Sequence, residues 1–214
     1  MNSIHLQQTL PNVFADRNRI DSELWHHDIV LERGRHYLVE AASGTGKSSL
    51  CSYLYGYRDD YQGLILFDEK NIRQFTTNQW TDLRRRHLSL LFQELRIFPE
   101  LTVLENIRLK NRLTGHKTEK EIKQMIEALG LTDKLHERMQ TLSYGQQQRV
   151  AFVRALCQPF DFILLDEPIS HLDATNARIM TEMLLTEAEK QGAGIIATSI
   201  GNHLDMAYDQ VLKL

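Results

Sequence analysis

Residues 39–49 read VEAASGTGKSS and join an apolar run to a stretch with helical spacing that begins at Leu50. This order of patterns predicts a strand, a glycine-rich loop and a helix. Gly44 and Gly46 let the backbone approach an anion closely, and the first turn of the following helix offers free N–H groups at its positive end. The segment therefore predicts a loop that binds phosphate groups.

Two side chains after the second glycine sharpen this prediction. Lys47 is placed to reach the β- and γ-phosphates of a nucleoside triphosphate, and Ser48 is placed to bind Mg²⁺. The usual motif has glycine where this chain has Ala41, which costs about 1 kcal/mol if the local φ is positive. A glycine-rich turn with a chance lysine is the alternative for this motif alone. The loop residues expected at the nucleotide are Ser43, Gly44, Thr45, Gly46, Lys47, Ser48 and Ser49.

A second motif places two acids at the end of an apolar run. Residues 162–165 are Phe-Ile-Leu-Leu, and Asp166 and Glu167 follow directly. A buried parallel strand delivers carboxylates to the edge of a sheet in this way. Asp166 is predicted to lie at Mg²⁺, and Glu167 to orient or deprotonate an attacking water. Taken alone, the motif also fits a buried strand that ends in solvated acids.

A third motif, residues 142–149, reads LSYGQQQR. Ser143 and Gln146 are predicted to cap the helix that follows. The free N–H groups of such a helix start also bind anions, whichever chain supplies them. Capping and anion binding are compatible roles for this segment.

The whole chain limits the class of protein. Its 214 residues, 42% hydrophobic and 25% charged, fit one α/β domain with a full core. A net charge of -3 gives no basic field, so nucleic acid is not expected as a partner. The apolar runs fall short of the roughly 18 residues that a membrane-spanning helix needs. Cys51 and Cys157 are not spaced as a metal site or a disulfide framework, so two reduced core thiols are expected.

The remaining pattern predicts the order of the elements. Residues 98–153 are mostly helical, and a capping box at Thr118 and Glu121 opens a helix that runs to about Leu129. Further helices are expected at residues 78–86 and 173–190. Strands are expected at residues 4–10, 24–31, 36–39, 63–67, 162–165, 194–198 and 210–214. The chain is thus predicted to be α/β with a helical insertion.

Taken together, these motifs resemble the nucleotide-binding subunit of ABC transporters over nearly the whole chain. The signature at residues 142–146 is similar to LSGGQ, with Tyr144 in place of its first glycine. Residues 166–168 resemble the Walker B motif with its catalytic glutamate, and residues 170–173 resemble the D-loop. Residues 92–94 and 98–107 are similar to the Q-loop and the start of the helical subdomain. The motifs also stand in the family's order.

The resemblance implies a P-loop NTPase fold of the ABC ATPase type: α/β, with a parallel-sheet core, an N-terminal antiparallel β subdomain and an inserted α-helical subdomain. Residues 1–92 and 154–214 would form the core with the β subdomain, and residues 93–153 the helical subdomain with the signature. The single domain 1–214 is similar in size to the compact ATPases of lipoprotein-release, macrolide-export and cell-division systems.

The resemblance also implies ATP hydrolysis with ATP and Mg²⁺ as cofactors. Ser48, Gln93 and Asp166 would lie at the metal, and Glu167, Gln93 and Lys47 would be catalytic. Gln93 would further link the metal site to membrane permease subunits. The chain would then be cytoplasmic, held at the inner face of the cell membrane by its permease. A nucleotide-dependent scaffold, or a non-transport ABC protein with weak hydrolysis, is the alternative.

In the family two such subunits meet head to tail around ATP. The partner would be a second copy or a paralogous ATPase subunit, and Ser143, Gly145 and Gln146 would contact the triphosphate bound by the other protomer. Phe14 is the candidate aromatic residue for stacking on adenine, and an ordinary core phenylalanine is the alternative.

One departure concerns the position where similar proteins carry a switch histidine. Ser199 occupies that place. A hydroxyl supplies no cationic donor, so slow hydrolysis is expected, and Ser199→His is expected to raise turnover. His203 is expected to be a surface histidine on a helix rather than a substitute. Ala41, Tyr144 and Ser199 favour the scaffold alternative, whereas the retained lysine and carboxylates favour an active ATPase.

Overall fold

The most deeply buried strands form one parallel sheet in the computed structural model, which describes residues 1–16, 21–42 and 44–214. Its order is β6-β7-β8-β3-β9, and every neighbouring pair is parallel. All residues of β7 and β8 are buried, as expected for apolar runs in a sheet that is covered on both faces. The strands are β3 (His36–Glu40), β6 (Leu88–Leu91), β7 (Phe162–Asp166), β8 (Gly194–Ser199) and β9 (Gln210–Lys213).

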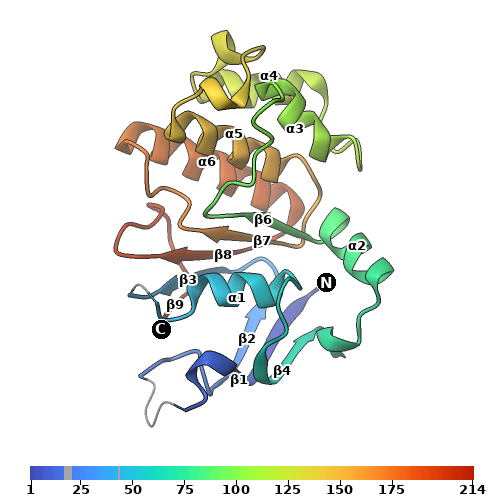
Figure 1. Cartoon of the computed structure of the whole chain (residues 1–214), viewed down its shortest axis with the longest axis vertical. Coiled ribbons are helices and arrows are strands. Elements are labelled where there is room, and N and C mark those ends of the chain that lie inside the picture. Colours follow the sequence, from blue (N-terminus) through green and yellow to red (C-terminus); the bar gives the residue numbers. More distant parts are fainter. Residues whose placement is uncertain (17–20, 43) are drawn as a thin grey trace.

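Alternating side chains of this sheet enter two different cores. Ile163 and Leu165 pack in a cluster with helices α3 to α6, whereas Phe162 and Leu164 pack in a cluster with helix α1 and the second sheet. Figure 1 shows the same layers, with α5 and α6 on one side of the parallel sheet and α1 on the other. The helices are α1 (Lys47–Leu54), α2 (Thr77–Arg86), α3 (Val103–Asn111), α4 (Glu119–Ala128), α5 (Tyr144–Leu156) and α6 (Ala174–Gln191).

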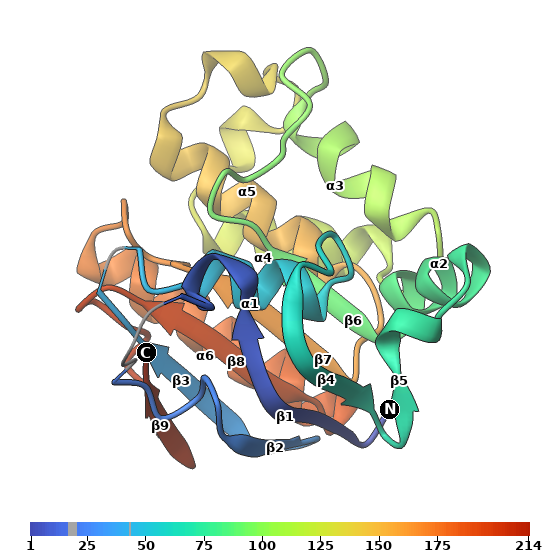
Figure 2. The same ribbon diagram turned by 60° about the horizontal axis from the view of Figure 1, so that its bottom comes forward.

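The second sheet is antiparallel, in the order β2-β1-β4-β5, and Figure 2 shows it in front of α1. Its pairing shifts register between Gln7 and Leu10. Gly63, with φ +77°, lies at this bulge, where a Cβ would meet the Gln8 carbonyl oxygen at 2.3 Å. The strands are β1 (Ser3–Pro11), β2 (Asp28–Glu32), β4 (Tyr61–Phe67) and β5 (Lys70–Asn71).

The strand expected at residues 24–31 is shorter than predicted, because β2 begins at Asp28. The Ser22 hydroxyl accepts hydrogen bonds from the N–H groups of Leu24 and Trp25 and holds the preceding residues in a turn. The other predicted strands and helices are present, with small differences at their ends.

Side-chain caps define several helix starts. The predicted capping box of Thr118 and Glu121 is present, and α4 ends where Gly130 takes φ +65°. Ser143 and Gln146 form the same box at the start of α5, as predicted.

Short 3₁₀ turns complete the chain at Asn12–Phe14, Ile72–Gln74, Thr132–Lys134 and Met139–Thr141. Among the described residues, none of the helices has the length and apolar character that crossing a bilayer requires.

Candidate functional site

A pocket of about 390 Å³ opens where β3, β6, β7 and β8 end. Parallel strands of such a sheet place their carboxyl ends at one edge, where ligands bind. Four strand ends contribute to the pocket: the loop after β3, Gln93 after β6, Glu167 after β7 and Ile200 after β8. The lining residues are Val13, Phe14, Gly44, Gly46, Lys47, Ser48, Ser49, Gln93, Glu167 and Ile200.

The glycines of the loop have the conformations that their residue type allows. Gly44 has φ +81° and Gly46 has φ +104°. A Cβ on Gly46 would lie 3.1 Å from Phe14 Cε2 and 3.2 Å from Trp25 Cζ2. The position therefore needs glycine for its backbone angle and for the close approach of two rings. Ser43 lies outside the described residues.

Trp25 supports this loop and was not predicted to do so. Its indole N–H donates to the Thr45 carbonyl oxygen at 3.0 Å, and the residue is 2% exposed. The Thr45 hydroxyl in turn donates to the Ala42 carbonyl oxygen at 2.8 Å. The only sequence signal was an aromatic residue in an apolar segment. The buried indole N–H of Trp25 therefore stabilises the loop through its hydrogen bond to Thr45.

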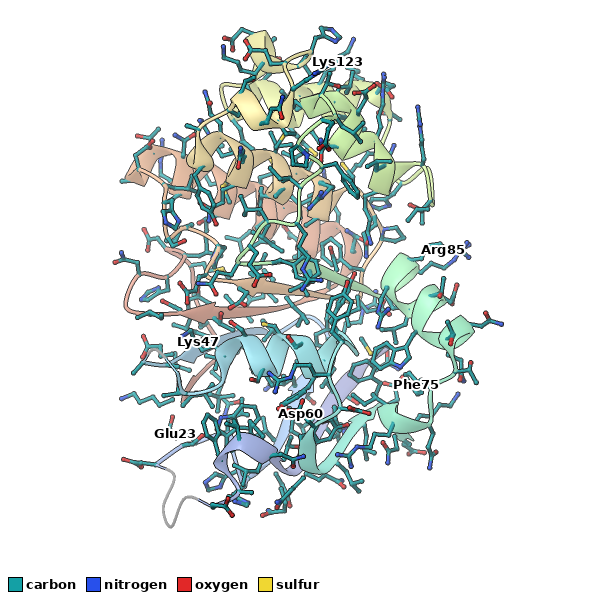
Figure 3. The ribbon with its side chains drawn as sticks, in the orientation of Figure 1. Glu23, Lys47, Asp60, Phe75, Arg85 and Lys123 are labelled. Atoms are coloured by element: carbon teal, nitrogen blue, oxygen red, sulfur yellow. The ribbon has the colours of Figure 1, made fainter. Side chains whose placement is uncertain are left out.

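Lys47 is the first residue of α1 and is 5% exposed; Figure 3 shows it at the first turn of that helix. Its Nζ lies 3.4 Å from the Ala42 carbonyl oxygen and 3.6 Å from Glu167 Oε1. A buried ammonium needs such acceptors. An anion in the pocket would meet this charge and the N-terminus of α1 together.

The two acids after the apolar run have different environments. Asp166 is 6% exposed, and its Oδ1 accepts a hydrogen bond of 2.7 Å from the hydroxyl of Thr198 on the neighbouring strand. Glu167 has φ +50°, a strained angle for a residue other than glycine. Its N–H donates to Thr198 Oγ1 at 3.3 Å. Strain of this kind is maintained at functional sites, and here it accompanies the approach of Glu167 to Lys47.

Hard oxygen donors gather beside the loop. The Ser48 hydroxyl lies 3.5 Å from Gln93 Oε1, and Asp166 lines the same hollow as both. No cluster of three or more His, Cys, Asp or Glu suited to a metal occurs among the described residues. The donor set fits Mg²⁺, which binds one or two carboxylates and takes phosphate oxygens and water as its other ligands.

The start of α5 does not contribute to the described lining of this pocket. None of the three signature residues, Ser143, Gly145 and Gln146, is among the described residues that line it. Ser143 is exposed, and a Cβ on Gly145 would lie 3.0 Å from the His171 carbonyl oxygen. The helix start therefore packs against the segment that follows Glu167 and leaves its cap open to the outside.

A family profile described as ABC transporter matches residues 26–170, which hold the loop, the signature and both acids. The chain belongs to the ABC transporter family. The predicted P-loop ABC ATPase fold and the assignment to ATP-binding, ATP-hydrolysing cassettes are therefore confirmed at the level of the family.

Three relatives illustrate the family match. The lipoprotein-releasing system ATP-binding protein LolD of Legionella pneumophila is 29% identical over 218 residues, covering 100% of this chain and 96% of LolD. The macrolide export ATP-binding/permease protein MacB of Aggregatibacter actinomycetemcomitans is 30% identical over 217 residues. The chain spans 33% of that protein. The dimeric bacterial ABC transporter cassette MJ0796 shares the fold, with a TM-score of 0.80 at 24% identity over 99% of this chain and 94% of the other.

Ser199, at the position where similar proteins carry the switch histidine, is not among the described residues that line the pocket. Ser199 is 1% exposed, and its hydroxyl donates to the Asn202 carbonyl oxygen at 2.6 Å. Ile200, which is 46% exposed, lines the pocket instead. Within the described lining, Lys47 is the one cationic side chain. His203 is exposed but not helical, which corrects the prediction, because it lies in the irregular segment between β8 and β9.

Phe14 is 5% exposed and belongs to the core cluster around α1, yet it also lines the pocket. Both of the alternatives weighed for this residue therefore remain, and stacking on adenine stays a prediction. Cys51 and Cys157 are buried free thiols, as expected.

Proposed function

We propose that the chain is the subunit of an ABC transporter that binds and hydrolyses ATP and drives a separate membrane permease by dimerising around the nucleotide. The observation that carries the proposal is the approach of Lys47 to the strained Glu167 beside the glycine loop. The names of LolD and MacB, which are ATP-binding proteins of release and export systems, support the transport role.

The pocket residues take the following roles. Lys47 and the N–H groups of residues 43–49 bind the β- and γ-phosphates, and Glu167 orients or deprotonates the attacking water. Ser48, Gln93 and Asp166 hold Mg²⁺, which when bound neutralises charge on the phosphates. Phe14 is the residue proposed at adenine.

A second protomer completes the site. No residue from the start of α5 is among the described residues that line the pocket, while the exposed cap of α5 offers free N–H groups outside it. Ser143, Gly145 and Gln146 of a second copy, or of a paralogous ATPase subunit, bind the γ-phosphate from the opposite side. Residues 93–153, with α3, α4 and most of α5, form the helical subdomain of the single domain 1–214, and the remaining residues form the core.

The proposed contact with the permease is a groove next to Gln93. Its volume is about 380 Å³, and Phe98 and Leu113 in it are 50% and 54% exposed. Arg96, Lys110 and Arg154 line the same groove. Apolar side chains surrounded by cations favour a partner segment that carries apolar residues and carboxylates. Such a contact holds the chain at the cytoplasmic face of the cell membrane.

One experiment tests the proposal. The purified chain is assayed for ATP turnover beside Lys47→Ala and Glu167→Gln, and its dimerisation is followed with and without Mg-ATP. Turnover that both substitutions abolish, with a dimer of Glu167→Gln in Mg-ATP, supports the proposal. A Glu167→Gln form that stays monomeric at high concentration, even with its permease present, contradicts it.

A nucleotide-dependent scaffold is the second candidate, favoured by the absence of a cation other than Lys47 from the described lining of the pocket. The same assay separates the two. A scaffold dimerises in Mg-ATP but turns over no faster than Glu167→Gln.

A further inference from the structure

Tyr144, which replaces the signature's first glycine, reaches across to the Q-loop of its own chain. It is the first residue of α5, and its hydroxyl donates to the Gln93 carbonyl oxygen at 2.8 Å. In Figure 2 the segment after β6, which contains Gln93, runs past the start of α5. A glycine at this position has no side chain to make the contact.

The ring of Tyr144 makes a second contact. It packs edge-on against the His171 ring, with the centroids 4.5 Å apart and the planes at 65°. One turn further along α5, the Gln148 side-chain amide donates to the Pro168 carbonyl oxygen at 2.8 Å. The start of α5 is therefore fixed to the segment after Glu167 by several contacts, and to the Q-loop by the Tyr144 hydroxyl.

Whereas the backbone carbonyl of Gln93 contacts Tyr144, its side chain faces the nucleotide pocket. Its side chain lines the pocket, and its Oε1 lies 3.5 Å from the Ser48 hydroxyl. A continuous set of contacts thus runs from Ser48 through Gln93 and Tyr144 to the exposed cap at Ser143. The Tyr144 hydroxyl is protonated at neutral pH, and burial, with Glu94 and Glu167 nearby, raises its pKa further above the usual value.

We propose that Tyr144 is a positioning residue that couples occupancy of a protomer's own nucleotide pocket to the placement of its α5 cap, the group that acts on the partner's triphosphate. This inference rests on the proposed function, because it assumes that the pocket binds Mg-ATP. When Gln93 moves onto the loaded site, its carbonyl carries the Tyr144 hydroxyl and the start of α5 with it. Each protomer then presents its cap in full only when its own pocket is filled.

Hydrogen–deuterium exchange of the isolated protomer tests the coupling directly. The chain is diluted until it is monomeric, and amide exchange is measured with and without Mg²⁺ and a non-hydrolysable ATP analogue. In the wild type we expect slower exchange at residues 44–49 and also at the start of α5, by about threefold to tenfold, the range that one hydrogen bond supports. Tyr144→Phe keeps the ring against His171 and is expected to retain only the effect at residues 44–49.

Tyr208→Phe is the matched control, because the Tyr208 hydroxyl also donates to a backbone carbonyl, that of Leu204 at 3.1 Å. It is expected to behave as the wild type. Equal slowing at α5 in wild type and Tyr144→Phe overturns the coupling, as does a wild type that responds only at residues 44–49. A wild type without any response at residues 44–49 would instead contradict the nucleotide-binding function itself.

Kinetics give an independent readout. Tyr144→Phe is expected to lower kcat by about threefold to tenfold while the Kd of the monomer for the analogue is unchanged. An equal loss in Kd indicates a general loosening of the pocket and contradicts a positioning role. Thermal unfolding of each variant confirms that the compared chains are folded.

Discussion

Lys47 Nζ and Glu167 Oε1 lie 3.6 Å apart, although the loop before Lys47 follows β3 and Glu167 follows β7, two strands that are not neighbours in the sheet. β8 lies between β3 and β7, so the pair depends on the whole sheet edge rather than on one motif. The cation proposed to bind phosphate and the carboxylate proposed to activate water are thereby held at the same point of the pocket. Each can be tested separately.

Glu167→Gln is expected to lower ATP turnover by about 10²- to 10⁴-fold, because an amide cannot accept the proton of the attacking water. Binding should remain, since Lys47 and the loop are untouched. Turnover under saturating Mg-ATP is the measurement, with Glu69→Gln, an exposed acid in the β4–β5 turn, as control. A variant that retains wild-type turnover would show that another group activates the water.

Lys47→Ala is expected to weaken binding of a non-hydrolysable ATP analogue by about 10- to 100-fold, the value of a charge-assisted contact to phosphate. Titration with a fluorescent analogue measures the Kd. Lys70→Ala in β5, at an exposed position, is the control. If Lys47→Ala binds the analogue with the wild-type Kd, Lys47 does not contact the phosphates.

Trp25→Phe removes the indole N–H and leaves the Thr45 carbonyl oxygen without its donor. We expect a loss of about 1 kcal/mol in the free energy of unfolding and a several-fold weaker Kd for nucleotide, because the loop loses its support. Trp80→Phe is the control, since Trp80 packs on Phe67 and Phe75 in another part of the molecule. If both variants bind nucleotide as the wild type does, Trp25 has only a packing role.

The role of Trp25 shows where prediction from the sequence stops. The glycine loop, the acids after β7 and the cap at Ser143 were predictable, because each depends on neighbours within a few residues along the chain. The contact of Trp25 with Thr45 spans 20 residues, and that of Tyr144 with Gln93 spans 51. Such contacts depend on how strands and helices pack, which periodicity does not encode. The sequence pattern also did not indicate that the turn after Ser199, closed by its bond to Asn202, places Ile200 in the lining of the pocket.

Ser199→His tests whether the missing histidine limits hydrolysis. An imidazole that turned from the buried position of Ser199 into the pocket would add a donor for the γ-phosphate, so kcat is expected to rise. Because Ser199 is 1% exposed, the larger ring must open the contact with Asn202, at a stability loss of about 1–3 kcal/mol. Steady-state kinetics together with thermal unfolding measure both effects. An unchanged or reduced kcat in a folded variant contradicts the expectation.

Lys110, in the groove beside Gln93, is expected to make the free energy of unfolding depend on pH. Burial, with Arg154 and Arg84 nearby, lowers the pKa of Lys110 from 10.5 to about 8. Between these values the unfolded chain binds the proton that the folded chain has lost, so the free energy of unfolding contributed by Lys110 rises with pH. Below pH 8 the folded chain carries the full penalty of a poorly solvated ammonium.

Urea unfolding of the wild type and Lys110→Met from pH 7 to 10.5 measures this contribution as a difference, in which other titrating groups cancel. The wild type is expected to gain stability relative to Lys110→Met as the pH rises above 8. Parallel curves would show that Lys110 has an ordinary pKa. Addition of the permease should remove the difference, because a carboxylate docked in the groove favours the protonated amine. A difference that persists in the complex would place the permease contact elsewhere.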